Sequence, residues 1–171
     1  QVVDKGGIVK AICVPGGAEF SRKDLDDLTE FAQIYGAKGM AWIKRNPDGW
    51  QSPIGKFFTD EQKQALEERV GLNEGDLVLF CADQKKVVYD SLGNLRKEIA
   101  RRRGLLDDSE YRFVWVTDFP LFEYSETEKS YTSSHHPFTM PDTDDLEKYA
   151  DDTPEKIRSR AYDVVLNGVE I

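Results

Sequence analysis

The first part of this chain folds around Leu77-Val78-Leu79-Phe80-Cys81-Ala82, a run of six consecutive apolar residues. A strand with one solvated face alternates apolar and polar side chains, whereas a continuous apolar run is typical of a strand buried on both faces. We therefore expect residues 77–82 to form a buried strand. A helical pattern over residues 84–103 follows and ends before Gly104.

Upstream of this run, the sequence predicts four more elements. They are a strand at residues 7–14, a helix at 21–35, a hairpin of 40–44 with 50–58, and a helix at 59–70. Each helix is preceded by a capping-box pair, Ser21 with Asp24 and Thr59 with Gln62. This order suits a compact α+β domain, with a mixed or antiparallel sheet and the helices packed on one face.

The character of the sequence changes after Gly104. Residues 105–112 are polar and acidic, as in a connector, and we expect a domain boundary between residues 108 and 109. The elements predicted beyond it are a strand at residues 113–117, a hairpin of 121–124 with 129–133, and a charged loop with short helical pieces at 141–156.

Composition and charge narrow the class of protein. Of the 171 residues 39% are hydrophobic and 11% aromatic, which favours a folded globular protein. The net charge of −9 is opposite to that of a domain that grips phosphate backbones unaided. The basic cluster Arg96-Lys97 and Arg101-Arg102-Arg103 lies late in a predicted helix, where a solvated helix end is favoured over an RNA-binding patch.

Several further classes of protein and site are not indicated. The sequence contains no run of eighteen apolar residues that would predict a membrane span, and it contains no secretory signal pattern. We therefore expect a cytoplasmic protein. Cys13 and Cys81 lie in apolar runs without a metal-binding spacing, which indicates buried reduced thiols.

The strongest local signal for a site is Asn167-Gly168, which predicts a two-residue hairpin turn. In that hairpin Val165 lies opposite Glu170, and Asp163 lies two residues along from Val165. Asp163 and Glu170 are then diagonal neighbours on one sheet face, with Cα atoms roughly 7–8 Å apart. Two carboxylates so placed could hold one hard cation, with Mg²⁺ bridging substrate phosphates as the natural candidate. The alternative is a pair of acids on a solvated hairpin face.

His135 and His136 are the only histidines of the chain. Adjacent residues on a strand point to opposite faces, so this pair is poorly placed to share one metal ion. A single histidine that contacts an anionic or amino-acid substrate is reasonable, because imidazole donates directional hydrogen bonds and changes charge near neutral pH. The alternative is that both are ordinary structural histidines.

Three stretches together resemble bacterial aspartyl-tRNA synthetases: Trp-Val-Thr-Asp-Phe-Pro at 115–120, His-His-Pro-Phe-Thr-Met-Pro at 135–141, and Ala-Tyr-Asp-Val-Val-Leu-Asn-Gly-Val-Glu at 161–170. Upstream, residues 7–12, 28–32 and 35–43 resemble the GAD-type domain that bacterial members insert between the second and third class II motifs. The resemblance implies an inserted α+β domain at residues 1–108 and part of a class II catalytic domain, with its antiparallel sheet, at 109–171.

The resemblance also implies an activity and roles for the site residues. The family activates L-aspartate with ATP, uses Mg²⁺ on the phosphates, and transfers the aspartyl group to tRNA; the intact enzymes are homodimers. His135 corresponds to a residue that contacts the bound aspartate, Glu170 to an acid of the ATP site, and Asp163 to its metal-binding companion. The metal ligands implied are therefore Asp163 and Glu170. His136 is assigned either aspartate contact or a role in positioning its loop.

The resemblance leads us to expect an internal piece of such a ligase. The chain contains neither the arginine-bearing second motif nor the glycine-rich third motif, so we expect it to be inactive alone. Two alternatives stay open. The GAD-type domain is also found in a tRNA-dependent amidotransferase subunit, where it would be a noncatalytic module. A stand-alone metal-dependent phosphoesterase built on Asp163 and Glu170 would need more ligands than the sequence offers.

Overall fold

The computed structural model describes residues 2–107, 109–125 and 127–171. The chain divides into two compact units, one reaching to Leu106 and the other beginning at Asp107. The boundary expected between residues 108 and 109 falls next to Asp108, which lies outside the described residues. Each unit is described by itself below.

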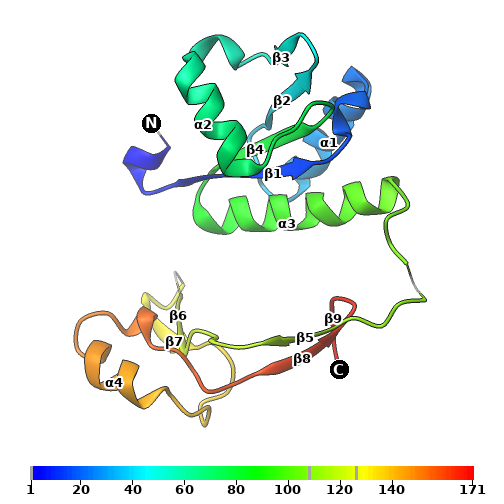
Figure 1. Cartoon of the computed structure of the whole chain (residues 1–171). Coiled ribbons are helices and arrows are strands. Elements are labelled where there is room, and N and C mark those ends of the chain that lie inside the picture. Colours follow the sequence, from blue (N-terminus) through cyan, green and yellow to red (C-terminus); the bar gives the residue numbers. More distant parts are fainter. Residues whose placement is uncertain (1, 108, 126) are drawn as a thin grey trace. The chain divides into compact units, whose positions relative to one another are not determined.

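The first unit is built on a four-stranded antiparallel sheet with the strand order β1-β4-β2-β3 (Figure 1). The strands are β1 (Ile8–Val14), β2 (Ala41–Asn46), β3 (Gly49–Gln51) and β4 (Leu77–Asp83). The helices are α1 (Arg22–Ile34), α2 (Asp60–Val70) and α3 (Lys85–Arg102), with single 3-10 turns at Val3–Lys5, Gly17–Glu19 and Gly55–Phe57. The predicted α+β class with an antiparallel sheet is confirmed.

Strand β4 lies between β1 and β2 and is buried on both faces, as its apolar sequence predicted. On one face Leu79 and the alternate residues of β4 pack against α1 and α3. On the other face Val78 packs with Ile43 and Leu72, against a layer that includes Leu66 and Val70 from the α2 region. The sheet is therefore the middle layer of the unit.

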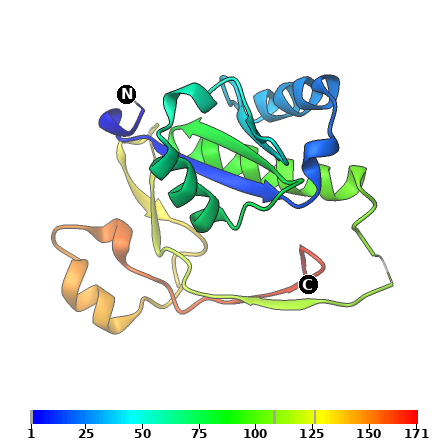
Figure 2. The ribbon, with the colours of Figure 1, turned by 45° about the horizontal axis from the view of Figure 1, so that its top comes forward.

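The expectation that the helices pack on one face of this sheet is wrong. Helix α2 covers the face opposite α1 and α3, as Figure 2 also shows. The physical reason lies in β4, since a strand that is apolar at every position needs a cover on both sides. The connection to β3 reinforces this placement, because the Trp50 Nε1 donates to the Glu67 carboxylate of α2 at 2.6 Å.

Local sequence signals fix where these helices begin and end. Both predicted capping boxes are present, at Ser21 with Asp24 and at Thr59 with Gln62. Gly71 ends α2 with a φ of 65°, a left-handed conformation that glycine adopts without steric cost. The second strand of the predicted hairpin is shorter than expected, because Ser52 and Pro53 leave the ladder after Gln51.

The second unit contains a three-stranded antiparallel sheet, order β5-β8-β9, and a separate hairpin of β6 with β7 (Figure 1). The strands are β5 (Phe113–Val116), β6 (Phe122–Ser125), β7 (Ser130–Ser133), β8 (Asp163–Leu166) and β9 (Val169–Glu170). Helix α4 (Thr143–Tyr149) and a 3-10 turn (Pro154–Lys156) occupy the charged segment, as predicted. Asp142 caps α4 by accepting from the backbone N–H of Asp144 and Asp145.

Within the described parts of the chain, no helix is both long and apolar enough to cross a membrane.

Candidate functional site

The predicted hairpin at the end of the second unit is present. Asn167 and Gly168 have φ values of 50° and 85°, and they join β8 to β9 as a two-residue turn. Val165 pairs with Glu170 and Leu166 pairs with Val169. This is the register that the sequence predicted.

That register places Asp163 and Glu170 on one face of the sheet. Glu170 lies directly opposite Val165, and Asp163 lies two residues before Val165 on the same strand. On the other side of β8, Val116 pairs with Asp163 and Val114 with Val165, so valines adjoin both acids on this face. Asp163 is half-buried and Glu170 is exposed. An ion bound there would face apolar side chains on one side and open space on the other.

The donor set of this hairpin fits a hard divalent cation that brings ligands of its own. Asp163 and Glu170 supply carboxylate oxygens, the ligands that Mg²⁺ prefers, and Mg²⁺ keeps several water or phosphate oxygens when bound. No cluster of three or more histidine, cysteine, aspartate or glutamate side chains with metal-binding geometry occurs among the described residues. The pair therefore suits a cation that arrives with a nucleotide.

Asn167 ties the hairpin turn to the segment that leads into β5. Its side-chain Oδ1 accepts from the backbone N–H of Arg112 at 2.9 Å, and its Nδ2 donates to the Glu110 carbonyl at 2.7 Å. Its own backbone N–H donates to the Arg112 carbonyl at 3.0 Å. One turn residue thus sets both the hairpin and the start of the neighbouring strand.

We expect Asn167→Ala to destabilise the second unit by about 1–2 kcal/mol, because alanine loses both side-chain hydrogen bonds and is strained at positive φ. Asn167→Gly is the matched control, since glycine loses the same hydrogen bonds but adopts a positive φ without strain. Urea unfolding followed by the fluorescence of Trp115 in β5, in a Trp42→Phe and Trp50→Phe background, measures both. Equal stability of Asn167→Ala and the unsubstituted chain would contradict this role.

His135 lies just after β7, on the loop that leaves the β6–β7 hairpin, and its side chain is exposed. Its ring packs edge-on against the ring of Phe119, with centroids 4.8 Å apart. Phe119 belongs to the turn that follows β5. The contact fixes the orientation of the imidazole, while His135 stays exposed to solvent.

His136 is engaged in the turn that it begins. Its carbonyl accepts from the backbone N–H of Thr139 at 2.9 Å, closing a turn with Pro137 at the second position. Its ring Nδ1 accepts from the backbone N–H of Phe138 at 3.2 Å. The imidazole of His136 therefore holds its own loop, which supports the positioning role over ligand contact.

The structure brings the two acids to one sheet face and keeps the two histidines on another loop. Within the described residues no hydrogen bond or ring contact joins His135 or His136 to Asp163 or Glu170. The two groups belong to the same unit but to different elements. Any ligand contacting both would have to extend from the β7 loop to the β8–β9 hairpin.

The sequence does not reveal the role of Arg158, whose side chain binds two distant acidic residues of this unit. Arg158 binds the carboxylate of Asp145 through Nε and Nη2 at 2.6 and 3.1 Å, and that hydrogen bonding holds the pKa of Asp145 below its ordinary value. The sequence predicts the segment that holds Asp145 as a charged loop with short helical pieces and assigns Asp145 no partner. The available signal was Asp142, whose N-cap pattern starts a helix and turns Asp145 inward.

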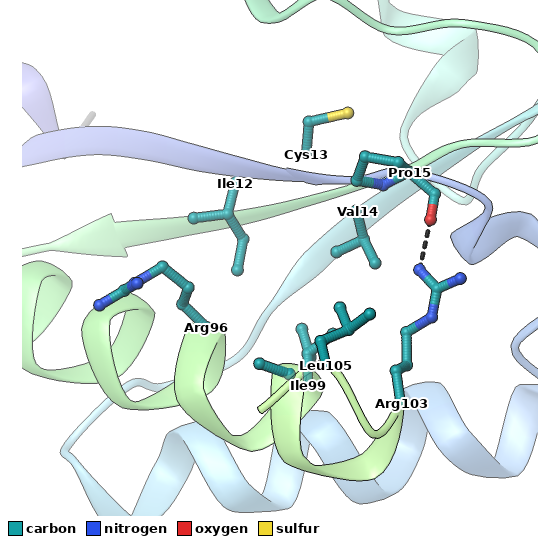
Figure 3. Close-up of a pocket in the computed structure, with 9 residues that line it drawn as sticks. Ile12, Cys13, Val14, Pro15, Arg96, Ile99, Arg103 and Leu105 are labelled. Carbon is teal, nitrogen blue, oxygen red and sulfur yellow. Dashed lines mark hydrogen bonds between the residues drawn. The ribbon is translucent and has the colours of Figure 1, made fainter. Parts of the chain in front are cut away.

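The first unit contains an apolar cavity and a paired basic cluster. A cavity of about 330 Å³ lies between β1 and α3, and its lining is mostly apolar (Figure 3). Arg103 donates to the Pro15 carbonyl at one end of it. Arg101 and Arg102 bind Glu98 and hold its pKa at about 2, so these members of the basic cluster are paired at the helix end. None of the predicted site residues lines this cavity.

Comparison with known proteins gives the chain a family. The GAD domain family matches residues 1–92. The chain is 58% identical over 169 residues to an aspartate–tRNA(Asp/Asn) ligase of Desulfosudis oleivorans and 56% identical over 172 residues to one of Desulfatibacillum aliphaticivorans. It is 51% identical over 172 residues to an aspartate–tRNA ligase of Staphylococcus carnosus. These matches cover 99–100% of this chain but only 28–29% of each relative.

The similarity extends through both units, so it includes the β8–β9 hairpin and the histidine loop as well as the sheet of the first unit. A free-standing noncatalytic module is not favoured by this extent, because the ligases match the chain from end to end. The family model, which covers more than half of the residues, settles the membership: the chain belongs to the GAD domain family.

Proposed function

We propose that this chain is part of an aspartate–tRNA ligase, which activates L-aspartate with ATP and transfers it to tRNA. One observation carries the proposal: the β8–β9 register places Asp163 and Glu170 on one face, in a chain similar along its whole length to ligases of that name. The chain spans under a third of the length of those relatives, so the complete reaction belongs to the longer protein.

In this proposal Asp163 and Glu170 hold the metal ion, and Glu170 also faces the ATP. Mg²⁺ bound there would spread the negative charge that develops on the reacting phosphate. The two side chains act by placing charge, and the strand pairing sets the backbone positions from which they extend before substrate arrives.

His135 contributes binding of the amino-acid substrate in this proposal. Its ring is fixed against Phe119 and its outer edge is open, so a ring N–H can donate to the carboxylate of L-aspartate. His136 stabilises the same loop, because its Nδ1 accepts a hydrogen bond from the backbone N–H of Phe138. Residues 1–108, which include the whole first unit, would be the inserted GAD-type domain, and residues 109–171 part of the catalytic domain.

The remaining parts of the proposal concern the longer protein. We assign it ATP, Mg²⁺, L-aspartate and tRNA as cofactors and substrates, a homodimeric state and a cytoplasmic location, all on the resemblance to the ligase family. A metal-dependent phosphoesterase is the alternative. It is less well supported, because the hairpin pair is joined by no third protein ligand among the described residues.

The proposal is tested by ATP–pyrophosphate exchange with the intact ligase. We expect exchange that depends on L-aspartate, and no exchange from the 171-residue chain alone at the same concentration. Exchange at the same rate with and without L-aspartate would contradict the proposed activity. So would hydrolysis of simple phosphate esters without any exchange.

We expect His135→Ala in the intact ligase to raise the KM for L-aspartate about 10- to 100-fold with little change in the KM for ATP, because a hydrogen bond to a charged group is lost. His136→Asn is the matched control, since its amide oxygen can replace Nδ1 in the bond to the Phe138 N–H. An unchanged KM for L-aspartate in His135→Ala would remove His135 from the binding site.

A further inference from the structure

Arg158 contacts two separate segments of the second unit. Its Nε and Nη2 bind the two carboxylate oxygens of Asp145, and its backbone N–H donates to the same carboxylate at 3.1 Å. Asp145 is only 8% exposed. A buried carboxylate that receives three hydrogen bonds from one residue fixes that residue closely, because losing any donor would leave an acid under-satisfied.

The third nitrogen of the same guanidinium reaches a different segment. Nη1 of Arg158 donates to Asp118 at 3.0 Å, and Asp118 holds a φ of 60° in the turn after β5. The next residue in that turn is Phe119, on which the ring of His135 packs. Arg158 therefore joins helix α4, through Asp145, to the turn that supports His135.

Backbone hydrogen bonds of residues 157–159 join the same segments. The Ser159 N–H donates to the Phe119 carbonyl at 2.7 Å, and the Leu121 N–H donates to the Ile157 carbonyl at 2.8 Å. On the other side, the Asp142 N–H donates to the Arg158 carbonyl at 2.8 Å. Residues 157–160 thus lie between the turn before β6 and the segment that follows the histidine loop.

The same segment continues directly into the candidate metal site. Three residues after Arg160 the chain reaches Asp163, the first residue of β8. Asp163 itself is held by its pairing with Val116 of β5, so residues 157–160 place the support of His135 relative to a strand that is fixed independently. The side chain of Arg158 links the turn that supports His135 to the segment that leads into β8.

We propose that Arg158 is a positioning residue that sets the distance between His135, at the amino-acid end of the site, and Asp163, at the phosphate end. The inference rests on the proposed function. The planar guanidinium is required, because it binds Asp145 with two nitrogens and Asp118 with a third. Lysine carries the charge but cannot make that set of bonds.

The test uses Arg158→Gln and Arg158→Lys in the intact ligase, with ATP–pyrophosphate exchange as the readout. Displacement of a binding group by about 1 Å can cost up to about 100-fold. We expect Arg158→Gln to raise the KM for L-aspartate at least about tenfold, with the KM for ATP within about twofold, and Arg158→Lys to recover only part of the loss. Arg160→Gln is the matched control, because the Arg160 side chain donates to the Thr143 hydroxyl at the surface.

Asp118→Asn separates positioning from folding. It weakens the bond from Arg158 to the turn of Phe119, together with the local bond from the Thr117 hydroxyl, and leaves the pair with Asp145 intact. The unit therefore keeps its fold and the KM for L-aspartate still rises. Equal increases in both KM values, or an unchanged KM for L-aspartate in the Arg158 and Asp118 variants, would overturn the inference. Loss of aspartate dependence in the unsubstituted enzyme would instead overturn the proposed function.

Discussion

Replacing Asp163 by Asn or Glu170 by Gln in the intact ligase is expected to lower kcat for ATP–pyrophosphate exchange about 100- to 1,000-fold. Each change removes one negative charge from a pair that the β8–β9 register holds on one sheet face. The expected size corresponds to the loss of one group that stabilises charge in the transition state. The backbone pairing survives both changes, because it does not use these side chains.

The matched control for the acids is Glu147→Gln. It removes one negative charge from an exposed position on α4 and leaves the hairpin untouched. We expect the activity of this variant to stay within about twofold of the unsubstituted enzyme. If Asp163→Asn and Glu170→Gln were as active as Glu147→Gln, the pair would be an ordinary solvated hairpin face.

Leu79→Ala is expected to destabilise the first unit by about 2–5 kcal/mol, the usual range for emptying a buried leucine site. Leu79 is 0% exposed and lies in the middle of β4, between Ile12 of β1 and Trp42 of β2. The surrounding layers from α1 and α3 cannot collapse into the space without moving the sheet.

Urea unfolding of the 171-residue chain measures this effect, with Trp42 and Trp50 as the fluorescent probes of the first unit in a Trp115→Phe background. Val9→Ala is the control, because Val9 is 49% exposed on the edge strand β1 and its truncation is expected to change stability by less than about 0.5 kcal/mol. A similar small effect of Leu79→Ala would mean that β4 is not the centre of the unit.

The sequence was sufficient wherever a feature depends on neighbouring residues. The capping boxes at Ser21 and Thr59 and the turn at Asn167 with Gly168 formed as predicted. Each rests on hydrogen bonds or φ angles within a few residues, so the local pattern carries all the information that is needed. The register of the candidate acids followed from the same turn, because a two-residue loop fixes which residues face each other.

Features that depend on distant residues could not be predicted in the same way. Helix α2 has no buried residue of its own and a weak apolar stripe, so its sequence did not reveal that it covers the second face of the sheet. The bonds of Arg158 to Asp145 and Asp118 span 13 and 40 residues. A charged residue so far from its partners shows no sequence periodicity that identifies them, and the sequence made no prediction for Arg158.

The central claim, that Asp163 and Glu170 jointly hold the metal ion of a bound nucleotide, is tested most directly by a crystal structure of the intact ligase with ATP and Mn²⁺, in which anomalous scattering locates the ion. We predict one Mn²⁺ in direct contact with oxygens of both carboxylates and of the ATP phosphates, at metal–oxygen distances of about 2.0–2.3 Å. An ion bound to ATP with neither carboxylate in its coordination sphere, or the two side chains turned to opposite faces of the hairpin, would contradict the account.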